Sequence, residues 1–223
     1  MIGSGPSLNG VDVSLLADVD SIAFNRSYVA WKRWGFAPTY FVCLDPIAFQ
    51  DNVPEIQKLI EECPDTRFFL PESPKLARAR SLAQVSPVRL VCGHTFSKDI
   101  FALTDFGNVG ATSIQILALL GYRRIAMIGV DARYGRIDEN MAVSDSDGCA
   151  LVADDPDHFC AEYAKGKRLR VRPDLEKILG QWPQVAKECA SNGIEVRNAS
   201  SGSALDCFPL TSFASAIEWV REG

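Results

Sequence analysis

The sequence has no long apolar run and no surplus of positive charge, and each absence excludes a class of protein. No stretch approaches the roughly 18 consecutive apolar residues of a membrane-spanning helix, and no basic segment followed by an apolar one opens the chain as a signal peptide would. The formal net charge of −5 argues against binding to duplex nucleic acid, which requires a basic face. We therefore expect a soluble, cytoplasmic protein with neither a transmembrane segment nor a nucleic acid partner.

The cysteines lack the spacing of a metal site or of a disulfide framework. They are seven, an odd number, and no CxxC pair occurs, so neither a zinc ribbon nor a set of disulfides is indicated. Cys43 and Cys92 stand inside apolar runs, as buried packing residues do. With 47% hydrophobic residues, a chain of 223 residues can bury the core of one α/β domain, whereas two independent domains would be cramped.

Short runs of β-branched and aromatic residues alternate with helical patterns along the chain. Strands are expected at residues 21–25, 40–44, 67–70, 89–92, 125–130 and 194–198. Helices are expected at residues 53–62, 74–83, 111–120, 173–191 and 212–221. Several of these strands are apolar on both faces, as in a parallel sheet that helices cover. The alternation predicts an α/β fold with a doubly wound, mostly parallel, Rossmann-like sheet.

One stretch, residues 132–172, interrupts this alternation. It is polar and dense in charge, with little sustained periodicity. Connections of this length inside a compact domain are usually functional. We therefore expect a single α/β nucleotide-sugar-binding domain over residues 1–223, with residues 132–172 inserted as a lid of loops and short helices.

A glycine-rich turn, Gly3-Ser4-Gly5-Pro6-Ser7, stands close to the beginning of the sequence. Two glycines that flank a serine allow several backbone N–H groups to point toward one position, and the following proline and serine suit the start of a helix. The turn is therefore typical of a phosphate or ribose site. It is neither GxGxxG nor a P-loop, because no lysine follows. A plain turn between two elements is the alternative.

Polar residues follow several of the expected strands. In an open α/β sheet, ligands bind beyond the carboxyl ends of the strands. The residues at these positions are Asn25, Arg26, Asp45, His94, Asp131 and Asn198. Each one alone also suits a helix cap or a turn, but their coincidence predicts a ligand crevice at this edge of the sheet.

Six short motifs occur in a characteristic order: Gly3 to Leu8, Ser14-Leu15-Leu16, Asn25-Arg26-Ser27-Tyr28, Gly110 in a helix ending Leu120-Gly121-Tyr122, residues 125–131, and Asp157-His158-Phe159. In order and spacing they resemble bacterial sialyltransferases of glycosyltransferase family 42. They equally resemble the related MptE-like domain, which includes flagellin-modifying Maf proteins and archaeal 6-hydroxymethylpterin diphosphokinases. The resemblance extends from Gly3 to about Pro209 and implies a transferase that acts on a nucleotide-linked donor.

The resemblance implies a CMP-sugar site in which the glycine turn and Asn25 hold the phosphate and ribose. Asp45 stands where the sialyltransferases have asparagine; a carboxylate binds a ribose hydroxyl or a metal but repels a phosphate. Gly110 would let the ligand approach the start of a helix. The nucleotide-binding residues implied are Gly3, Ser4, Gly5, Pro6, Ser7, Asn25, Arg26, Asp45, Asn108, Gly110, Thr112 and Asp131.

His158 is the general base that the resemblance implies. Imidazole titrates near physiological pH and can take a proton from an acceptor hydroxyl, although a surface or capping histidine is the alternative. Tyr134 and Tyr163 are candidates for steadying the leaving phosphate. The lid also offers cations, which could instead form a solvated charged face. These are Lys165, Lys167, Arg168, Arg170 and Arg172.

The reaction implied is direct displacement at the anomeric carbon of the sugar, without a cofactor or a metal. The implied partners are the nucleotide-sugar donor and a glycan or small-molecule acceptor, and the resemblance suggests a homo-oligomer. One alternative is magnesium-dependent diphosphoryl transfer from ATP to a pterin-like alcohol, with Asp45 and Asp131 holding the metal. Another is a nucleotide- or sugar-binding module without catalysis.

The related proteins run a full strand into the glycine turn, whereas only Met1 and Ile2 precede it here. We expect either that the first strand begins upstream of Met1, or that the sheet tolerates the gap with a frayed turn.

Overall fold

The computed structural model describes residues 1–77, 81–133, 149–151, 157–170 and 179–222. Its framework is a five-stranded sheet in the order β1-β2-β3-β4-β5, and every neighbouring pair is parallel. The strands are β1 (Ile22–Phe24), β2 (Tyr40–Val42), β3 (Arg67–Pro71), β4 (Val85–Val91) and β5 (Ala102–Thr104). The prediction of a mixed α/β fold with a mostly parallel sheet is confirmed.

Ile2 joins this sheet to a second pair of strands. It bridges Ala23 of β1 on one side and Ile128 on the other. Ile128 follows β6 (Arg124–Met127), which pairs in parallel with β9 (Glu195–Asn198). The Ile2 N–H donates to Ile22 O at 2.8 Å, and the Gly3 N–H donates to Ile128 O at 2.7 Å. The glycine turn is therefore held on both sides and is not frayed.

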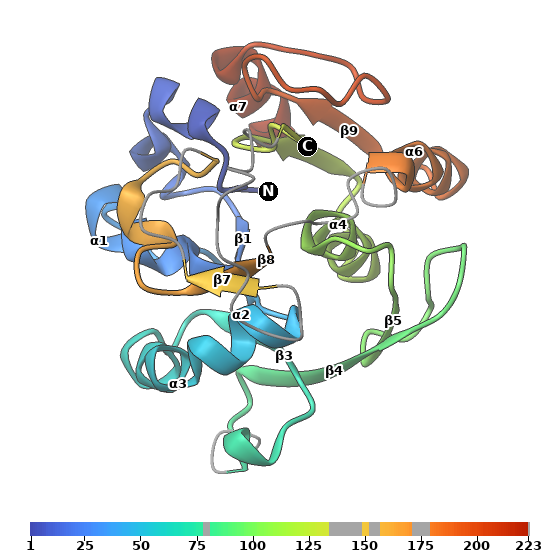
Figure 1. Cartoon of the computed structure of the whole chain (residues 1–223). Coiled ribbons are helices and arrows are strands. Elements are labelled where there is room, and N and C mark those ends of the chain that lie inside the picture. The colour runs from blue at the N-terminus through green and yellow to red at the C-terminus, as the bar shows by residue number, and fades with distance from the viewer. Residues whose placement is uncertain (78–80, 134–148, 152–156, 171–178, 223) are drawn as a thin grey trace.

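Helices cover both faces of the sheet, and each face has its own apolar core (Figure 1). In β3, Phe68 packs into one core and its neighbour Phe69 into the other, because side chains alternate along a strand. The helices of the first face are α1 (Trp31–Trp34), α2 (Pro46–Asp51), α3 (Val53–Glu62) and α7 (Phe213–Arg221). Those of the second face are α4 (Val109–Leu119) and α6 (Trp182–Ser191).

Some elements differ from the sequence predictions. The helix predicted at residues 74–83 is wrong, since a 3₁₀ turn, Pro74–Leu76, begins there under a Ser73 cap and the chain returns as β4 from Val85. Serine before proline starts a helical turn locally, and the described residues 81–83 do not continue it as an α-helix. The helix predicted at 173–191 is present as α6, while residues 173–178 lie outside the described part of the chain.

Part of the predicted lid is described. β7 (Cys149–Leu151) and β8 (Arg168–Arg170) form an antiparallel pair, and β8 packs against α2 (Figure 1). Residues 157–167 precede β8 and contain a 3₁₀ turn, Ala161–Tyr163. We name residues 157–170 the strap, because they run from the carboxyl edge of the sheet to α2.

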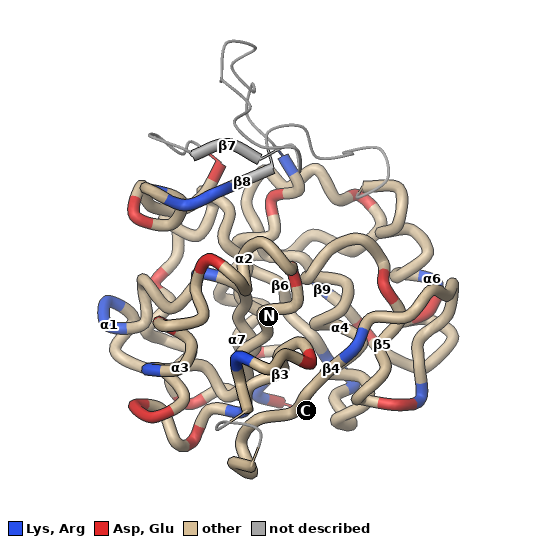
Figure 2. The backbone as a smooth tube through the Cα atoms, turned by 60° about the horizontal axis from the view of Figure 1, so that its bottom comes forward, with Lys and Arg blue, Asp and Glu red and all other residues tan. Residues whose placement is uncertain are grey.

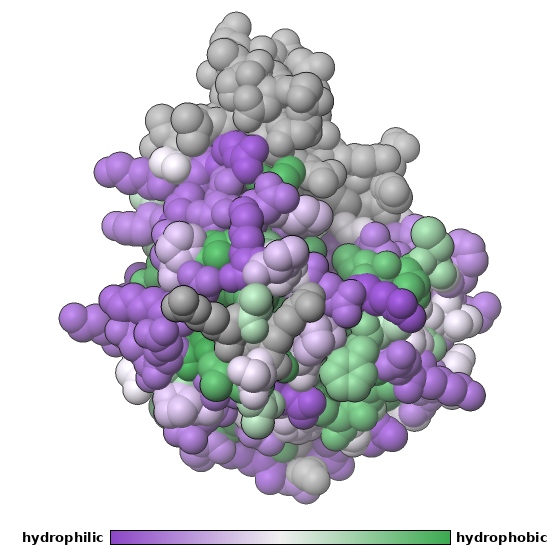
Figure 3. Space-filling model, turned by 90° about the horizontal axis from the view of Figure 1, so that it is seen from below, coloured by the Kyte–Doolittle hydropathy of each residue, from purple (hydrophilic) through white to green (hydrophobic). Residues whose placement is uncertain are grey.

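The described surface is mixed in charge and mostly hydrophilic. Lys and Arg alternate with Asp and Glu along the chain (Figure 2), and apolar side chains interrupt a hydrophilic face in Figure 3. Leu90 of β4 and Phe101 before the edge strand β5 are exposed by 38% and 51%. Among the described helices, none combines the length and the apolar character that crossing a membrane requires.

Candidate functional site

A pocket of about 190 Å³ lies beyond the carboxyl ends of β1 and β6. Seven of the residues predicted for the site line it: Ser4, Gly5, Asn25, Asn108, Gly110, His158 and Tyr163. The remaining walls are Phe24, Val109, Gly129, Val130, Ala132, Arg133, Leu179 and Trp182. The fold therefore brings together residues from six separate segments of the chain at the edge where α/β sheets bind ligands.

Strained backbone is concentrated at this pocket. Asn25 has φ 53° and Ala132 has φ 49°, and they are the two non-glycine residues with positive φ among those described. Both line the pocket. Such conformations cost of order 1 kcal/mol or more each and cluster at functional sites. The side-chain oxygen of Asn25 is also buried without a hydrogen-bond partner among the described residues, so its capacity to accept a hydrogen bond is unused within the fold.

The first turn of α4 forms a second wall. The Asn108 side chain caps this helix by accepting from the Ala111 N–H at 2.8 Å. Val109 and Gly110 line the pocket, and their N–H groups precede the first intrahelical bond. A Cβ at Gly110 would come within 3.0 Å of the Trp182 ring, so glycine allows the indole to pack here. A helix start with two such N–H groups favours an anion.

The glycine turn contributes less than its sequence predicted. The Gly5 N–H donates to Gly129 O at 2.8 Å, the Gly3 N–H is bonded to Ile128 O, and the Ser7 N–H donates to the Asp131 carboxylate at 2.9 Å. A Cβ at Gly3 would lie 2.2 Å from Gly129 O. The glycines therefore permit close packing against the end of β6, and the turn presents Ser4 and Gly5 to the pocket rather than a nest of free N–H groups.

His158 stacks on Tyr163 with ring centroids 4.0 Å apart and planes 15° apart. Tyr163 is buried, and burial raises its pKa to about 12 while a hydrogen bond with the Ser4 side chain opposes that rise. The neighbouring Phe159 N–H donates to Ser4 O at 2.9 Å, and Asn9 Nδ2 donates to Phe159 O at 2.8 Å. The imidazole is thus held against the glycine turn, on top of a protonated phenol.

Several predicted site residues lie away from the pocket walls. Asp45 caps α2, accepting from the Ile47 and Ala48 N–H groups at 2.9 and 2.8 Å. Asp131 accepts from both the N–H and the hydroxyl of Ser7. Asp45 is used inside the fold because it stands directly before the start of a helix, whereas Asp131 is used because the fold brings Ser7 to it.

The other predicted residues outside the pocket walls are Gly3, Pro6, Ser7, Arg26 and Thr112. Thr112 is buried and donates to Asn108 O at 3.2 Å. Arg26 is 9% exposed, and two of its nitrogens, Nε and Nη1, have no hydrogen-bond partner in the described part of the chain. Tyr134 lies outside the described residues.

The cation that lines the pocket is Arg133, whose Nε donates to Gly202 O at 2.6 Å. Sequence reasoning missed this residue, although it stands two positions after Asp131 at a strand end. Of the five predicted cations, Lys167 and Arg168 bind carboxylates of α2 and α3 instead, and Lys165 is exposed. Nothing is described for the side chain of Arg170 or for Arg172.

A larger cavity, of about 680 Å³, lies at the opposite edge of the sheet. Its walls include Ser21 before β1 and Arg124 at the start of β6, so it opens at the amino ends of the strands. Size alone favours this cavity, but its described walls contain no non-glycine residue with positive φ. The strained backbone and the helix start favour the smaller pocket as the functional site.

Comparisons with protein-family models, with curated proteins and with solved structures find no match to this chain. Within the described residues, no group of three or more His, Cys, Asp and Glu side chains is arranged to hold a metal ion.

Proposed function

We propose that this chain is a sialyltransferase-like glycosyltransferase, which moves a sialic-acid-like sugar from a CMP-sugar to an acceptor hydroxyl. The observation that carries the proposal is the convergence of three features on one pocket: the strained Asn25, the first turn of α4 and the His158–Tyr163 stack. Together they offer a ribose contact, an anion site and a base.

The proposal includes a doubly wound, Rossmann-like sheet. The strands β1 to β5 succeed one another on one side of Ile2, while β6 and β9 lie on the other side. In a doubly wound sheet, the nucleotide binds where the strand order reverses. The glycine turn directly follows Ile2, which supports a nucleotide at the pocket that Ser4 and Gly5 line.

The described walls suit only part of a nucleotide-sugar. The pocket of about 190 Å³ is smaller than the roughly 300–1,000 Å³ of typical small-molecule sites. We assign it to the phosphate and ribose, with the N–H groups of Val109 and Gly110 and the charge of Arg133 facing the phosphate. Trp182 supplies an apolar wall, and the sugar and acceptor would lie at the open mouth.

In the proposed reaction, His158 takes the proton of the acceptor hydroxyl while that oxygen attacks the anomeric carbon. A new carbon–oxygen bond forms as the bond from the sugar to the phosphate breaks, and CMP leaves with the electron pair. The negative charge on the departing phosphate is stabilised by the start of α4 and by Arg133. The reaction requires no change in oxidation state.

Diphosphoryl transfer from ATP has less support. It rested on Asp45 and Asp131 as magnesium ligands, and these carboxylates instead accept hydrogen bonds from α2 and from Ser7. A binding module without catalysis would use the same pocket but would not depend on the imidazole of His158.

His158→Ala tests the proposal, with His94→Ala as the control because His94 is exposed and lies outside the pocket. With a CMP-sialic acid donor and an oligosaccharide acceptor, we expect His158→Ala to lower kcat about 10²- to 10⁴-fold, as the loss of a general base does. His94→Ala should retain full kcat. Unchanged turnover in His158→Ala would contradict the assigned base.

Titration calorimetry with CMP and with ATP separates the candidate functions. We expect CMP to bind equally well with magnesium and with a chelator. ATP binding that requires magnesium, without CMP binding, would overturn the glycosyltransferase proposal in favour of diphosphoryl transfer. Tight CMP binding without turnover of any CMP-sugar would favour the binding module.

A further inference from the structure

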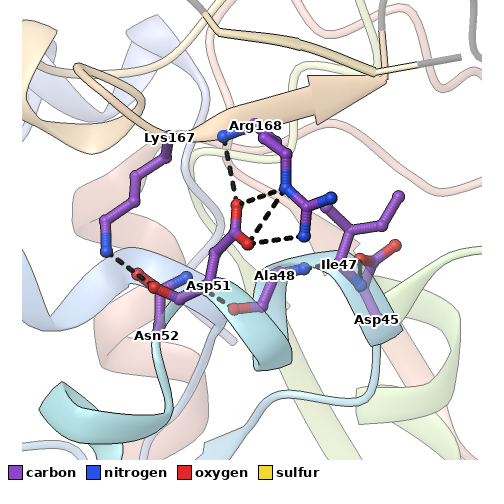
Figure 4. A network of polar contacts seen from close by, with 7 residues as sticks. All are labelled: Asp45, Ile47, Ala48, Asp51, Asn52, Lys167 and Arg168. Atoms are coloured by element: carbon purple, nitrogen blue, oxygen red, sulfur yellow. Dashed lines mark hydrogen bonds and ion pairs between the residues drawn. The ribbon is translucent and has the colours of Figure 1, made fainter. Parts of the chain in front are cut away.

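The strap carries two groups of the proposed site, His158 and Tyr163, and it is fixed at both of its ends. At the pocket, the Phe159 N–H binds Ser4 O at 2.9 Å, and the Phe159 ring packs near Trp34 with centroids 6.3 Å apart. At the other end, Lys167 and Arg168 bind Asp51 of α2 (Figure 4), and Lys167 also binds Glu55 of α3. Between these ends the strap contains one 3₁₀ turn, and Tyr163 and Ala164 are buried in the core of the first face, so core packing and the two end contacts together hold it.

The contact with α2 is centred on the carboxylate of Asp51. Arg168 donates to it from Nη2 at 2.7 Å, from Nε at 3.1 and 3.2 Å, and from its backbone N–H at 3.2 Å. The side chains of Asp51 and Arg168 are 16% and 29% exposed. Planar, partly buried pairs of this kind are more specific and less screened than exposed ion pairs.

Lys167 adds a second connection to the same helices. Its Nζ donates to the backbone oxygen of Asp51 at 2.7 Å and to Glu55 Oε1 at 3.0 Å. The strap is thereby bound to the last residue of α2 and to the first turn of α3, so it cannot rotate about a single contact.

The helix that receives the strap is itself rigidly held. Asp45 caps its first turn, and Asn52 at its end donates from Nδ2 to Ala48 O at 2.5 Å. Tyr28 Oη donates to Asn52 Oδ1 at 2.8 Å, which connects the helix to the segment after β1. Asp45 therefore lies outside the pocket but supports the element to which the strap is bound (Figure 4).

We propose that Asp51 is a positioning residue: by binding Arg168 it fixes the strap and thereby sets the position of His158 against Ser4. The role in catalysis rests on the proposed function, whereas the effect on the strap does not. Asp51 does not line the pocket, and its side chain binds Arg168 of the strap, so we expect its substitution to act through the strap.

Hydrogen exchange of the Phe159 amide, measured by NMR on the full chain, tests this proposal without a ligand. We expect Asp51→Asn and Arg168→Gln each to accelerate that exchange about tenfold, while amides of β2 and β3 keep their rates. The double variant should match either single variant, because both remove one interaction. Glu62→Gln is the control, since it breaks the exposed Lys58–Glu62 pair on α3 and should leave Phe159 unchanged.

Turnover of a CMP-sialic acid donor gives a second measurement. Asp51→Asn should lower kcat about tenfold and change the KM of the donor less than twofold, because the nucleotide contacts are intact and the base is displaced. An unchanged exchange rate of Phe159 in both single variants would overturn the positioning role. Faster exchange in a protein that turns over no CMP-sugar would support the strap contact and contradict the proposed function.

Discussion

The two edges of the sheet carry two different hollows. The cavity at the amino ends of the strands encloses about 680 Å³, and the pocket at the carboxyl ends encloses about 190 Å³. Yet the two non-glycine residues with positive φ in the described chain, Asn25 and Ala132, both line the smaller pocket. Strain persists only where the surrounding structure imposes it. Backbone strain and a helix start therefore favour the smaller pocket as the candidate site, whereas volume alone favours the larger cavity.

Replacing a glycine beside each cavity with alanine should have the largest effects on the free energy of unfolding, and the loss should differ between the two positions. Gly3→Ala places a Cβ 2.2 Å from the backbone oxygen of Gly129, so we expect a loss of about 3 kcal/mol or more in the free energy of unfolding. Gly121 lines the larger cavity with φ 99° and open space around it, so Gly121→Ala should cost roughly 1–2 kcal/mol. Urea denaturation measures both.

Gly10→Ala serves as the control for these variants, since no atom lies within 4 Å of its added Cβ. We expect its stability to stay within about 0.5 kcal/mol of the original. If Gly3→Ala were equally mild, the close approach of the glycine turn to the end of β6 would be wrong.

Relieving the strain at the small pocket should separate stability from binding. Asn25→Gly removes the positive-φ cost and the unpaired oxygen, so we expect stability to rise by up to about 1 kcal/mol while CMP affinity falls about tenfold, near 1.4 kcal/mol. Ala132→Gly should stabilise the fold similarly with little loss of affinity, because it removes only a methyl group. Thermal unfolding and calorimetry give the two quantities.

A stabilised Asn25→Gly protein that binds CMP normally would show that the Asn25 side chain has no role in binding. The preference for the small pocket would then rest on the helix start and His158 alone.

Acid should weaken the contact between Asp51 and the strap, and this is the smallest effect that we expect. The hydrogen bond from Arg168 holds the pKa of Asp51 below its ordinary value of 3.8, against the opposing effect of burial. A depressed pKa means that the pair stabilises the fold above about pH 4 and that this contribution is lost as the pH falls through the folded-state pKa. Phe159 amide exchange should therefore accelerate below about pH 4, beyond its intrinsic pH dependence.

The Asp18–Arg221 pair beside the larger cavity provides the contrast. Its side chains are 70% and 45% exposed, so 1 M salt should weaken it, whereas the Asp51–Arg168 pair should persist. Equal sensitivity of the two pairs to salt would contradict the partly buried character of the strap contact.

The sequence was most informative where structure depends on neighbouring residues. The helix at residues 53–62 was predicted with its observed bounds, because its apolar spacing and Pro54 are local signals. Of the six residues predicted after strands, Asn25 lines the pocket and the other five do not. The other six predicted site residues at the pocket came from the glycine turn and from the family resemblance. The sialyltransferase-like assignment itself stays a prediction.

What the sequence could not supply depends on contacts between distant residues. Ser7 and Asp131 are 124 positions apart, and their hydrogen bonds turn two predicted ligand contacts into structural ones. The free N–H groups expected of the glycine turn are taken by Ile128 and Gly129, which only the strand register brings close. The packing of Trp182 on Gly110 likewise has no local signal.

Ile2 is the single residue that bridges the five-stranded sheet to the β6–β9 pair. Asn25 follows β1 of the five-stranded sheet and Ala132 lies after β6 of the pair, so the pocket lies between these two parts. A ligand bound there would contact residues of both parts of the sheet. We therefore expect ligand binding at the pocket to stabilise the contact between these two parts of the sheet.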